Sequence, residues 1–242
     1  DEPPLARWKL DNMSDDRQVP DSGPAGMGGE FHGDSAGETV PGKVDGALDM
    51  GDQGYVDLSR HVDALAGLDT FTLTAWIRDP RDGVSILFSV SDGSASNRIQ
   101  FNLNRMFLVY LWQDQSAHWD SVAGRVNEWK PGQWYHVAVS VDSTGVRLYR
   151  DGELLTSGSV GIQLGTPCIG LPDLQNPRDV FLGHVREGTD RAAFEPQWSG
   201  EPQWFGGVMD DVQLYASALD HSAIRYLHEN PGEALPRPAE ER

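Results

Sequence analysis

The sequence predicts an all-β protein of the two-layer sandwich kind. From residue 70 to residue 158, apolar and polar residues alternate in short runs separated by turn residues, which is the periodicity of strands. The chain holds 27 Gly and 15 Pro, which indicates many turns and few long helices. Its 242 residues fit one sandwich domain, and a hydrophobic content of 38% is enough for a sizeable core.

The clearest strands follow one another through the middle of the chain. We expect them at 71–78, 84–90, 98–104, 106–112, 134–141 and 146–149. Turn-forming residues separate them at Asp92-Gly93, Lys130-Pro131-Gly132 and Asp151-Gly152.

Helical patterns are confined to a short turn at 62–68 and a segment at 217–228. In the second, Leu219, Ile224 and Leu227 approximate one helical face, and Asn230-Pro231 ends the helix. We therefore expect one short C-terminal helix that docks on the edge of the sandwich.

The domain boundary is predicted near residue 230. Residues 231–242 contain Pro, Glu and Arg with almost nothing apolar, so they bury too little to offset the entropy of ordering. We expect one domain over 1–230 and a polar tail or linker over 231–242.

Charge and hydropathy exclude several classes of partner. Lys plus Arg is 19 and Asp plus Glu is 37, so the net charge is −18, which argues against nucleic acid. The longest apolar run, 106–112, is far shorter than the roughly 20 residues of a spanning helix, so we expect no membrane insertion. The single cysteine, Cys168, cannot form an internal disulfide.

The first residues bear on localisation. The chain starts with Asp in the sequence DEPPLA rather than with Met, which is consistent either with removal of a signal peptide or with a sequence that begins at a boundary within a longer chain. We expect a secreted or periplasmic bacterial protein, and possible neighbours in the chain are other domains of a larger secreted protein.

Strand parity sorts the side chains into an apolar inner set and an unusual outer set. The outer set combines aromatic rings with planar hydrogen-bonding groups, where Thr, Ser, Lys and Glu are typical. It comprises Trp76, Arg78, Arg98, Gln100, Asn102, Tyr110, Trp112, His136, Arg147 and Tyr149. Such a face suits carbohydrate, because sugar rings pack on aromatic rings and hydroxyls pair with amides and guanidinium groups.

Three loop tryptophans extend this candidate site. Trp119, Trp198 and Trp204 lie in polar segments where no periodicity requires an aromatic residue. They are interpreted as ligand platforms, and the alternative is that each fills a small core within its own loop.

Several stretches spread along the chain carry a family resemblance. They are Trp8-Lys9-Leu10-Asp11, Asp21-Ser22-Gly23, 46–50, 55–58, 71–77, 132–139, 148–152 and 205–215, the last reading FGGVMDDVQLY. In this order they resemble the laminin-G-like branch of the concanavalin A-like lectin/glucanase superfamily, which also contains pentraxin-type domains. The resemblance implies a β-jelly-roll sandwich of two antiparallel sheets that binds carbohydrate through its concave face or rim loops.

The resemblance and the acidic loops together suggest a structural calcium ion. Calcium takes six to eight oxygen ligands from flexible acidic loops, and acidic residues crowd the segment after residue 10. The proposed ligands are Asp11, Asp21 and Asp210. Asp210 shares strand parity with Val212 and Leu214, so we expect it to point inward; alternatively, backbone N–H groups satisfy it without a metal.

The leading functional hypothesis is non-catalytic carbohydrate binding. No strand carries the paired carboxylates of a glucanase, because the glutamates fall in turns or loops. One alternative is a polysaccharide lyase in which Arg98 neutralises a uronate carboxylate while His136 or Tyr149 abstracts a proton. A second alternative is a protein-interaction or adhesion domain that binds no sugar.

Overall fold

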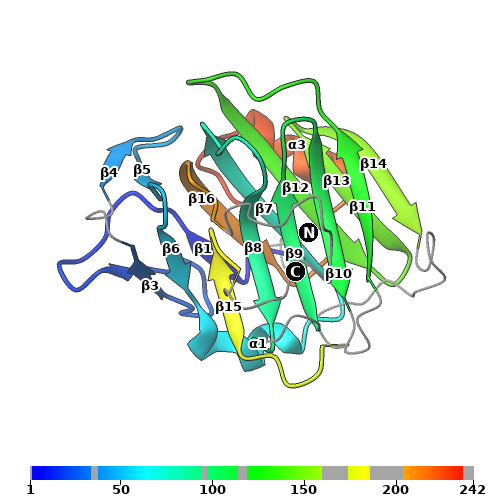
Figure 1. Cartoon of the computed structure of the whole chain (residues 1–242), viewed down its shortest axis with the longest axis horizontal. Coiled ribbons are helices and arrows are strands. Elements are labelled where there is room, and N and C mark those ends of the chain that lie inside the picture. Colours follow the sequence, from blue (N-terminus) through cyan, green and yellow to red (C-terminus); the bar gives the residue numbers. More distant parts are fainter. Residues whose placement is uncertain are drawn as a thin grey trace, which may run out of the picture.

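A computed structural model describes residues 2–33, 38–93, 97–113, 119–159, 174–185 and 204–236, without the side chains of 113, 119–120 and 156–159. Two antiparallel β-sheets face each other across one core (Figure 1). The predicted sandwich of two antiparallel sheets is confirmed. All six strands expected from the sequence are present, with ends within one residue of those expected.

Sheet A contains both the first and the last strand of the described chain. Its order is β14 (Glu153–Ser159), β13 (Gly145–Arg150), β12 (Trp134–Asp142), β7 (Phe71–Arg78), β16 (Val208–Tyr215), β5 (Gly46–Asp49) and β4 (Thr39–Pro41). A short strand, β1 (Ala6–Trp8), also pairs with β16.

Sheet B forms the other layer. Its order is β11 (Trp119–Arg125), β10 (Phe107–Gln113), β9 (Arg98–Leu103), β8 (Ser85–Ser91), β15 (Asp179–Leu182), β6 (Tyr55–Asp57), β3 (Gly29–His32) and β2 (Gln18–Val19). Strands distant in sequence thus meet at its centre, where β15 lies between β8 and β6.

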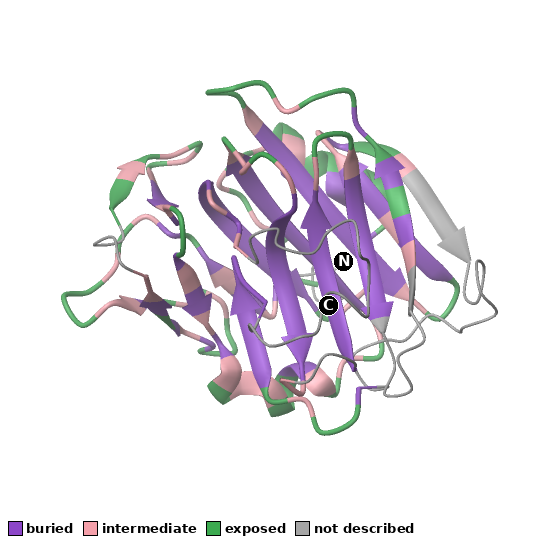
Figure 2. Ribbon diagram, in the orientation of Figure 1, coloured by how far each residue is buried: buried purple, intermediate pink, exposed green. Residues whose placement is uncertain are grey.

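The core lies between the two sheets. Leu73, Ile77 and Val139 of sheet A and Ile99 and Phe101 of sheet B belong to one cluster of buried side chains. Figure 2 shows that burial is nearly continuous along the central strands, whereas half-buried and exposed residues gather around β3, β4 and β6.

The helices of the described chain are short. A 3-10 turn (Ser59–His61) leads into α1 (Val62–Ala66), and α3 spans His221–Glu229, starting four residues later than expected. The carboxylate of Asp220 caps α3 by accepting a hydrogen bond from the Ala223 N–H at 2.9 Å. No helix in this part of the chain is long and apolar enough to cross a membrane.

Helix α3 covers the outer side of sheet A. Its Ile224 and Leu227 share a buried cluster with Tyr149 of β13 and Tyr215 of β16, separate from the central core. This side of the sandwich is therefore occupied by the protein itself.

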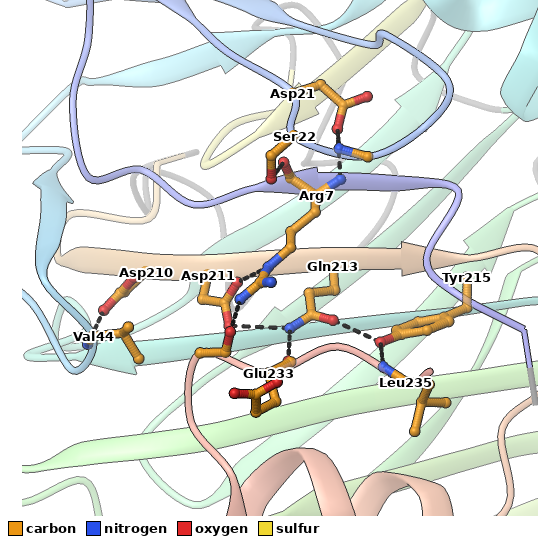
Figure 3. A network of polar contacts seen from close by, with 12 residues as sticks. Arg7, Asp21, Ser22, Val44, Asp210, Asp211, Gln213, Tyr215, Glu233 and Leu235 are labelled. Carbon is orange, nitrogen blue, oxygen red and sulfur yellow. Dashed lines mark hydrogen bonds and ion pairs between the residues drawn. The ribbon is translucent and has the colours of Figure 1, made fainter. Parts of the chain in front are cut away.

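The segment after α3 also packs on sheet A (Figure 3). The Gln213 side-chain amide donates to the Glu233 carbonyl at 2.9 Å, and Leu235 N–H donates to the Tyr215 hydroxyl at 3.3 Å. Leu235 is only 4% exposed. The expectation of an unpacked tail from residue 231 is wrong for 231–236, because these backbone groups find partners on β16; residues 237–242 lie outside the described chain.

Candidate functional site

The outer set of side chains does not form one face. Trp76 and His136 are cross-strand partners in sheet A, whereas Arg98, Gln100 and Asn102 alternate along β9 of sheet B. Because the shared core separates the sheets, the two groups lie on opposite outer faces of the sandwich. The prediction of a single concave face is therefore wrong.

Tyr110 and Trp112 lie in the core. They pair with Phe101 and Ile99 and belong to the same buried cluster as these residues. The intervening Leu111 and its neighbour Val109 face the other side instead. The prediction that Tyr110 and Trp112 line the outer face is wrong, because both alternations of this strand are apolar and cross-strand neighbours decided between them.

The side chains of the outer set that lie on sheet A are covered by other parts of the protein. The indole of Trp76 contacts the His136 ring at 5.1 Å and stacks on His228 of α3 at 5.6 Å, and Lys43 Nζ lies 4.5 Å from its centroid. Trp76 and His136 are 3% and 2% exposed. Burial, with a smaller contribution from His228, lowers the pKa of His136 to about 3 and keeps the ring neutral. Tyr149 is buried against α3 in the same way.

The remaining residues of sheet A stabilise its periphery. Arg147 pairs with Asp142 at 2.5 Å. The Arg78 guanidinium lies 4.9 Å above the Trp134 ring and donates to the Pro41 carbonyl at 3.3 Å. These contacts are within the sheet and bring neither arginine to the sheet B group.

The outer side of sheet B carries a continuous transverse row. Successive strand pairings place one residue from each of the eight strands side by side on this side of the sheet. The row runs Gln18, Glu30, Asp57, Phe181, Ser89, Gln100, Leu111 and Ser121. It changes from acidic side chains near β3 to neutral ones near β10.

Aromatic rings gather beside the acidic end of this row. His184 and Trp204 stack with centroids 3.9 Å apart and planes 11° apart, and Tyr55 lies 4.8 Å from His184. His32 stacks on Tyr55 at 5.1 Å, and Phe181 closes the group at 5.2 Å from His184. We call His32, Tyr55, Phe181, His184 and Trp204 the aromatic platform.

The platform is partly open and is anchored to the sheet. His32, Tyr55 and Trp204 are half-buried, whereas Phe181 and His184 are buried. The Ser89 hydroxyl donates to the His184 carbonyl at 2.7 Å, which ties the platform to the transverse row. Within the row, Gln100 and Ser89 are buried, whereas Glu30 is exposed and Gln18 and Asp57 are half-buried. The open ring surface is therefore flanked mainly by the carboxylates of Glu30 and Asp57.

Of the loop tryptophans, only Trp204 can be placed as a site residue. It bridges to His184 as an isolated β-pairing and contributes to the platform. Trp119 belongs to β11 by its backbone, but its side chain lies outside the described part of the chain, as does the whole of Trp198.

Sequence reasoning missed most of the platform. In the sequence, Tyr55 stands out only through the family resemblance, and nothing distinguishes His32, Phe181 or His184. No local pattern marks them, because the ring contacts join β3, β6 and the segment after β15, which are far apart in the chain.

A β-bulge in β16 determines on which side of the sheet the Asp210 side chain lies. Pairing with β7 shifts register between Asp210 and Gln213, and Asp211 has a φ of 42°. Asp210 is therefore the partner of Trp76 on the outer side of sheet A, although Val212 lies in the core. The prediction that Asp210 points inward is wrong, because the extra residue of the bulge reverses the alternation.

Asp210 holds the hairpin between β4 and β5. Its Oδ2 accepts hydrogen bonds from the N–H groups of Lys43 and Val44 at 2.7 and 2.9 Å, and its buried Oδ1 has no hydrogen-bond partner. Burial raises the pKa of Asp210 to about 7, against the effect of these two hydrogen bonds.

The three aspartates proposed as calcium ligands are not brought together. Both oxygens of Asp21 accept backbone hydrogen bonds, from Arg7, Gly23 and Met27 at 2.6–2.7 Å. Asp11 and Asp210 line a small pocket of about 80 Å³ near β16, and Asp21 does not line it.

The chemistry of that pocket is mixed. Asp45 and Asp211 line it as well, which adds carboxylates, but so do the cations Arg7 and Lys9. Within the described ranges, no three Asp, Glu, His or Cys side chains are grouped to hold a metal. Asp21 does not fit as a ligand, and calcium binding through Asp11 and Asp210 stays a prediction.

Two antiparallel sheets packed around one core, with a cluster of rings on one outer face, define a β-sandwich domain with a candidate binding surface. A family model described as the Concanavalin A-like lectin/glucanases superfamily, of the laminin-G type, matches residues 50–225. The chain belongs to this superfamily, and the resemblance seen in the sequence is confirmed.

Solved structures share the fold at low sequence identity. Domain 4 of AbnA, an extracellular GH43 arabinanase of Geobacillus stearothermophilus in complex with arabinotriose, aligns with a TM-score of 0.63 and 21% identity over 94% of this chain and 100% of that one. The CBM40 of the Ruminococcus gnavus IT-sialidase, bound to α2,3-sialyllactose, gives a TM-score of 0.61 at 16% identity over 75% and 96%.

A curated relative is a much longer protein. The adhesion G-protein coupled receptor V1 of Danio rerio is 22% identical over 169 residues, which are 68% of this chain. The match spans about 2% of that receptor's length.

Proposed function

We propose that the protein is a non-catalytic carbohydrate-binding domain whose ligand lies on the outer face of sheet B. The observation that carries the proposal is the aromatic platform, which is partly open and lies beside the accessible polar side chains of Gln18, Glu30 and Asp57. Sugar rings have apolar faces that pack on aromatic rings and hydroxyls that pair with amides and carboxylates.

The structures with the same fold support this proposal. The AbnA domain is described in complex with arabinotriose and the CBM40 with sialyllactose, so the fold serves carbohydrate recognition in both. A fold hosts many functions, and for this reason the proposal rests on the platform rather than on the similarity.

Lyase chemistry is disfavoured by the separation of its required groups. His136 and Tyr149 lie on the outer side of sheet A beneath α3, and Arg98 lies on the outer side of sheet B. A proton abstractor and a carboxylate-neutralising group must both touch one sugar unit. These three residues cannot do so from opposite faces of the sandwich.

We also place the domain outside the cytoplasm of a bacterial cell, as part of a secreted or periplasmic protein. A protein outside the cytoplasm can encounter extracellular polysaccharides, and the arabinanase AbnA is described as extracellular. A protein-interaction role is the remaining alternative, and the experiment below separates it from glycan binding.

The test is a glycan and polysaccharide panel with matched variants. Trp204→Ala removes one half of the closest ring stack, and we expect at least about tenfold weaker binding, as for truncation of an interface hot spot. The control is Tyr226→Ala, since Tyr226 is an exposed aromatic residue on α3, on the other side of the sandwich.

Each result decides between the candidate functions. Binding that is lost in Trp204→Ala and retained in Tyr226→Ala supports the proposal. Appearance of unsaturated uronate ends, followed by ultraviolet absorbance, would establish a lyase instead. Absence of any glycan binding by the wild-type protein would favour the protein-interaction domain.

A further inference from the structure

The acidic end of the transverse row bears directly on which glycans the platform accepts. Glu30 and Asp57 are cross-strand partners on β3 and β6, and the pair lies two residues along the strands from the His32–Tyr55 pair, on the same side of the sheet. Like charges placed directly opposite each other destabilise antiparallel strands. Repulsion between the two carboxylates therefore destabilises the fold locally. A ligand that donates hydrogen bonds to both carboxylates would reduce this repulsion.

Both carboxylates face a recess beside the platform. Glu30, Asp57, Ser59 and Arg60 line a hollow of about 160 Å³. The Glu30 side chain is 52% exposed, and its Oε1 lies 3.7 Å from Nε2 of His32. A sugar resting on His32 and Tyr55 is thus within reach of a carboxylate that still has free acceptor capacity.

The cation in this recess is already engaged. Arg60 donates from Nη2 and Nε to the Gly28 carbonyl at 2.6 and 3.1 Å. Nε also donates to Nε2 of the His61 ring at 3.0 Å, so these two guanidinium nitrogens are engaged within the protein. Arg98, farther along the face, is 2% exposed.

The charge of the whole chain acts in the same direction. A net charge of −18 produces a negative potential that repels polyanions and raises the local concentration of cations. The local pair and the overall charge both oppose a ligand that carries carboxylate or sulfate groups.

We infer that the platform takes glycans built from neutral or amino sugars and discriminates against anionic ones. This inference rests on the proposed function of the same face. Glu30 and Asp57 would accept hydrogen bonds from sugar hydroxyls or from the ammonium group of an amino sugar, and would repel a uronate placed on the rings.

The experiment compares polymers that differ mainly in charge. Oligomers of polygalacturonate are measured against their methyl esters, and chitosan oligomers against chitin oligomers, by calorimetry at low salt. We expect the uronate to bind at least about fivefold more weakly than its ester, and chitosan at least as tightly as chitin. In about 1 M salt, where the screening length falls to about 3 Å, the differences should shrink.

Two variants assign the effect to the recess. Glu30→Gln removes one carboxylate at an exposed site and should narrow the gap between uronate and ester. Glu128→Gln removes a carboxylate that is also exposed, at 63% against 52% for Glu30, and that lines a different pocket with Trp129. It should leave the difference in affinity between uronate and ester unchanged.

The outcomes separate this inference from the proposed function. Binding that depends on Trp204 but is equally tight for the uronate and its ester would overturn the inference and leave the function standing. If the difference in affinity between uronate and ester persists in Glu30→Gln, the recess does not cause it, and the role given to the recess is overturned. Failure of all four probes and of the wider glycan panel would overturn both.

Discussion

Arg7 and Asp211 form an ion pair, with Nε 2.6 Å from Oδ1, that joins β1 to β16 across 204 positions of the chain. The same guanidinium donates to the Gly232 carbonyl, and the other oxygen of Asp211 accepts from the Gln213 amide (Figure 3). The pair therefore connects the first strand, the last strand and the segment after α3 in one polar network.

Replacing Asp211 with Asn should destabilise the protein strongly. The Asp211 side chain is 3% exposed, so Asn leaves the Arg7 charge without a compensating carboxylate. We expect a loss of about 2–4 kcal/mol in the free energy of unfolding, measured by urea denaturation. In the control Glu229→Gln, which breaks the exposed Arg225–Glu229 pair, the loss should be much smaller, because solvent and salt screen exposed ion pairs. Equal losses in the two variants would contradict this view of the network.

The histidine beneath α3 should make the fold acid-sensitive. The pKa of His136 is about 3 in the folded protein and 6.5 ordinarily, so the unfolded chain takes up the proton first. Its contribution to stability is full above pH 6.5 and is lost as the pH falls toward 3. His136→Phe should become more stable relative to wild type over this range, by about 2–4 kcal/mol, in urea denaturation at a series of pH values. A wild-type-to-variant difference independent of pH would contradict it.

Asp210 should act in the opposite direction over the same range. Its pKa is about 7 when folded and 3.8 ordinarily, so the folded protein takes up the proton first. The associated stability is fully present below pH 3.8 and is lost as the pH rises through 7. Relative to Asp210→Asn, which keeps an oxygen acceptor for Lys43 and Val44, wild type should lose about 2–4 kcal/mol across this window.

The opposite pH dependences of His136 and Asp210 affect the stability profile of the wild-type protein. Between about pH 4 and pH 7, the effects of His136 and Asp210 partly cancel, so its stability should vary less with pH than that of either single variant. A wild-type profile as steep as that of a variant would show that one of the two groups is not buried as the structure has it.

Calcium binding is tested by the effect of the ion on thermal unfolding. A site at Asp11 and Asp210 should raise the melting temperature, since a ligand at about 100 times its Kd adds about 2.7 kcal/mol. Asp11→Asn should remove the increase. Asp21→Asn should lower stability with and without calcium alike, because Asp21 accepts only backbone hydrogen bonds. A melting temperature unchanged by calcium or chelator would end the prediction.

The sequence determined the layer architecture and the positions of its main strands. The segment 71–78 alternates core residues with outward ones, and β7 spans those residues. Turn residues and period-two alternation are local properties, so the sequence alone shows where these strands lie. Family motifs at both ends of the chain indicate the sandwich as well.

Only the tertiary structure decided which side chains share a face. Leu108, Tyr110 and Trp112 compete with Phe107, Val109 and Leu111 for the core, and pairing with Ile99 and Phe101 selected the first set. At Asp210, one extra residue in a bulge reversed the alternation.

The candidate site shows the same limit. Trp204 could be picked out as an aromatic residue in a polar loop, but its partner His184 and the rings of Tyr55 and His32 could not. Alternation along one strand does not say which sheet the strand joins or which strand lies beside it. Those long-range pairings placed Arg98 and His136 on opposite faces and assembled the platform from strands far apart in the chain.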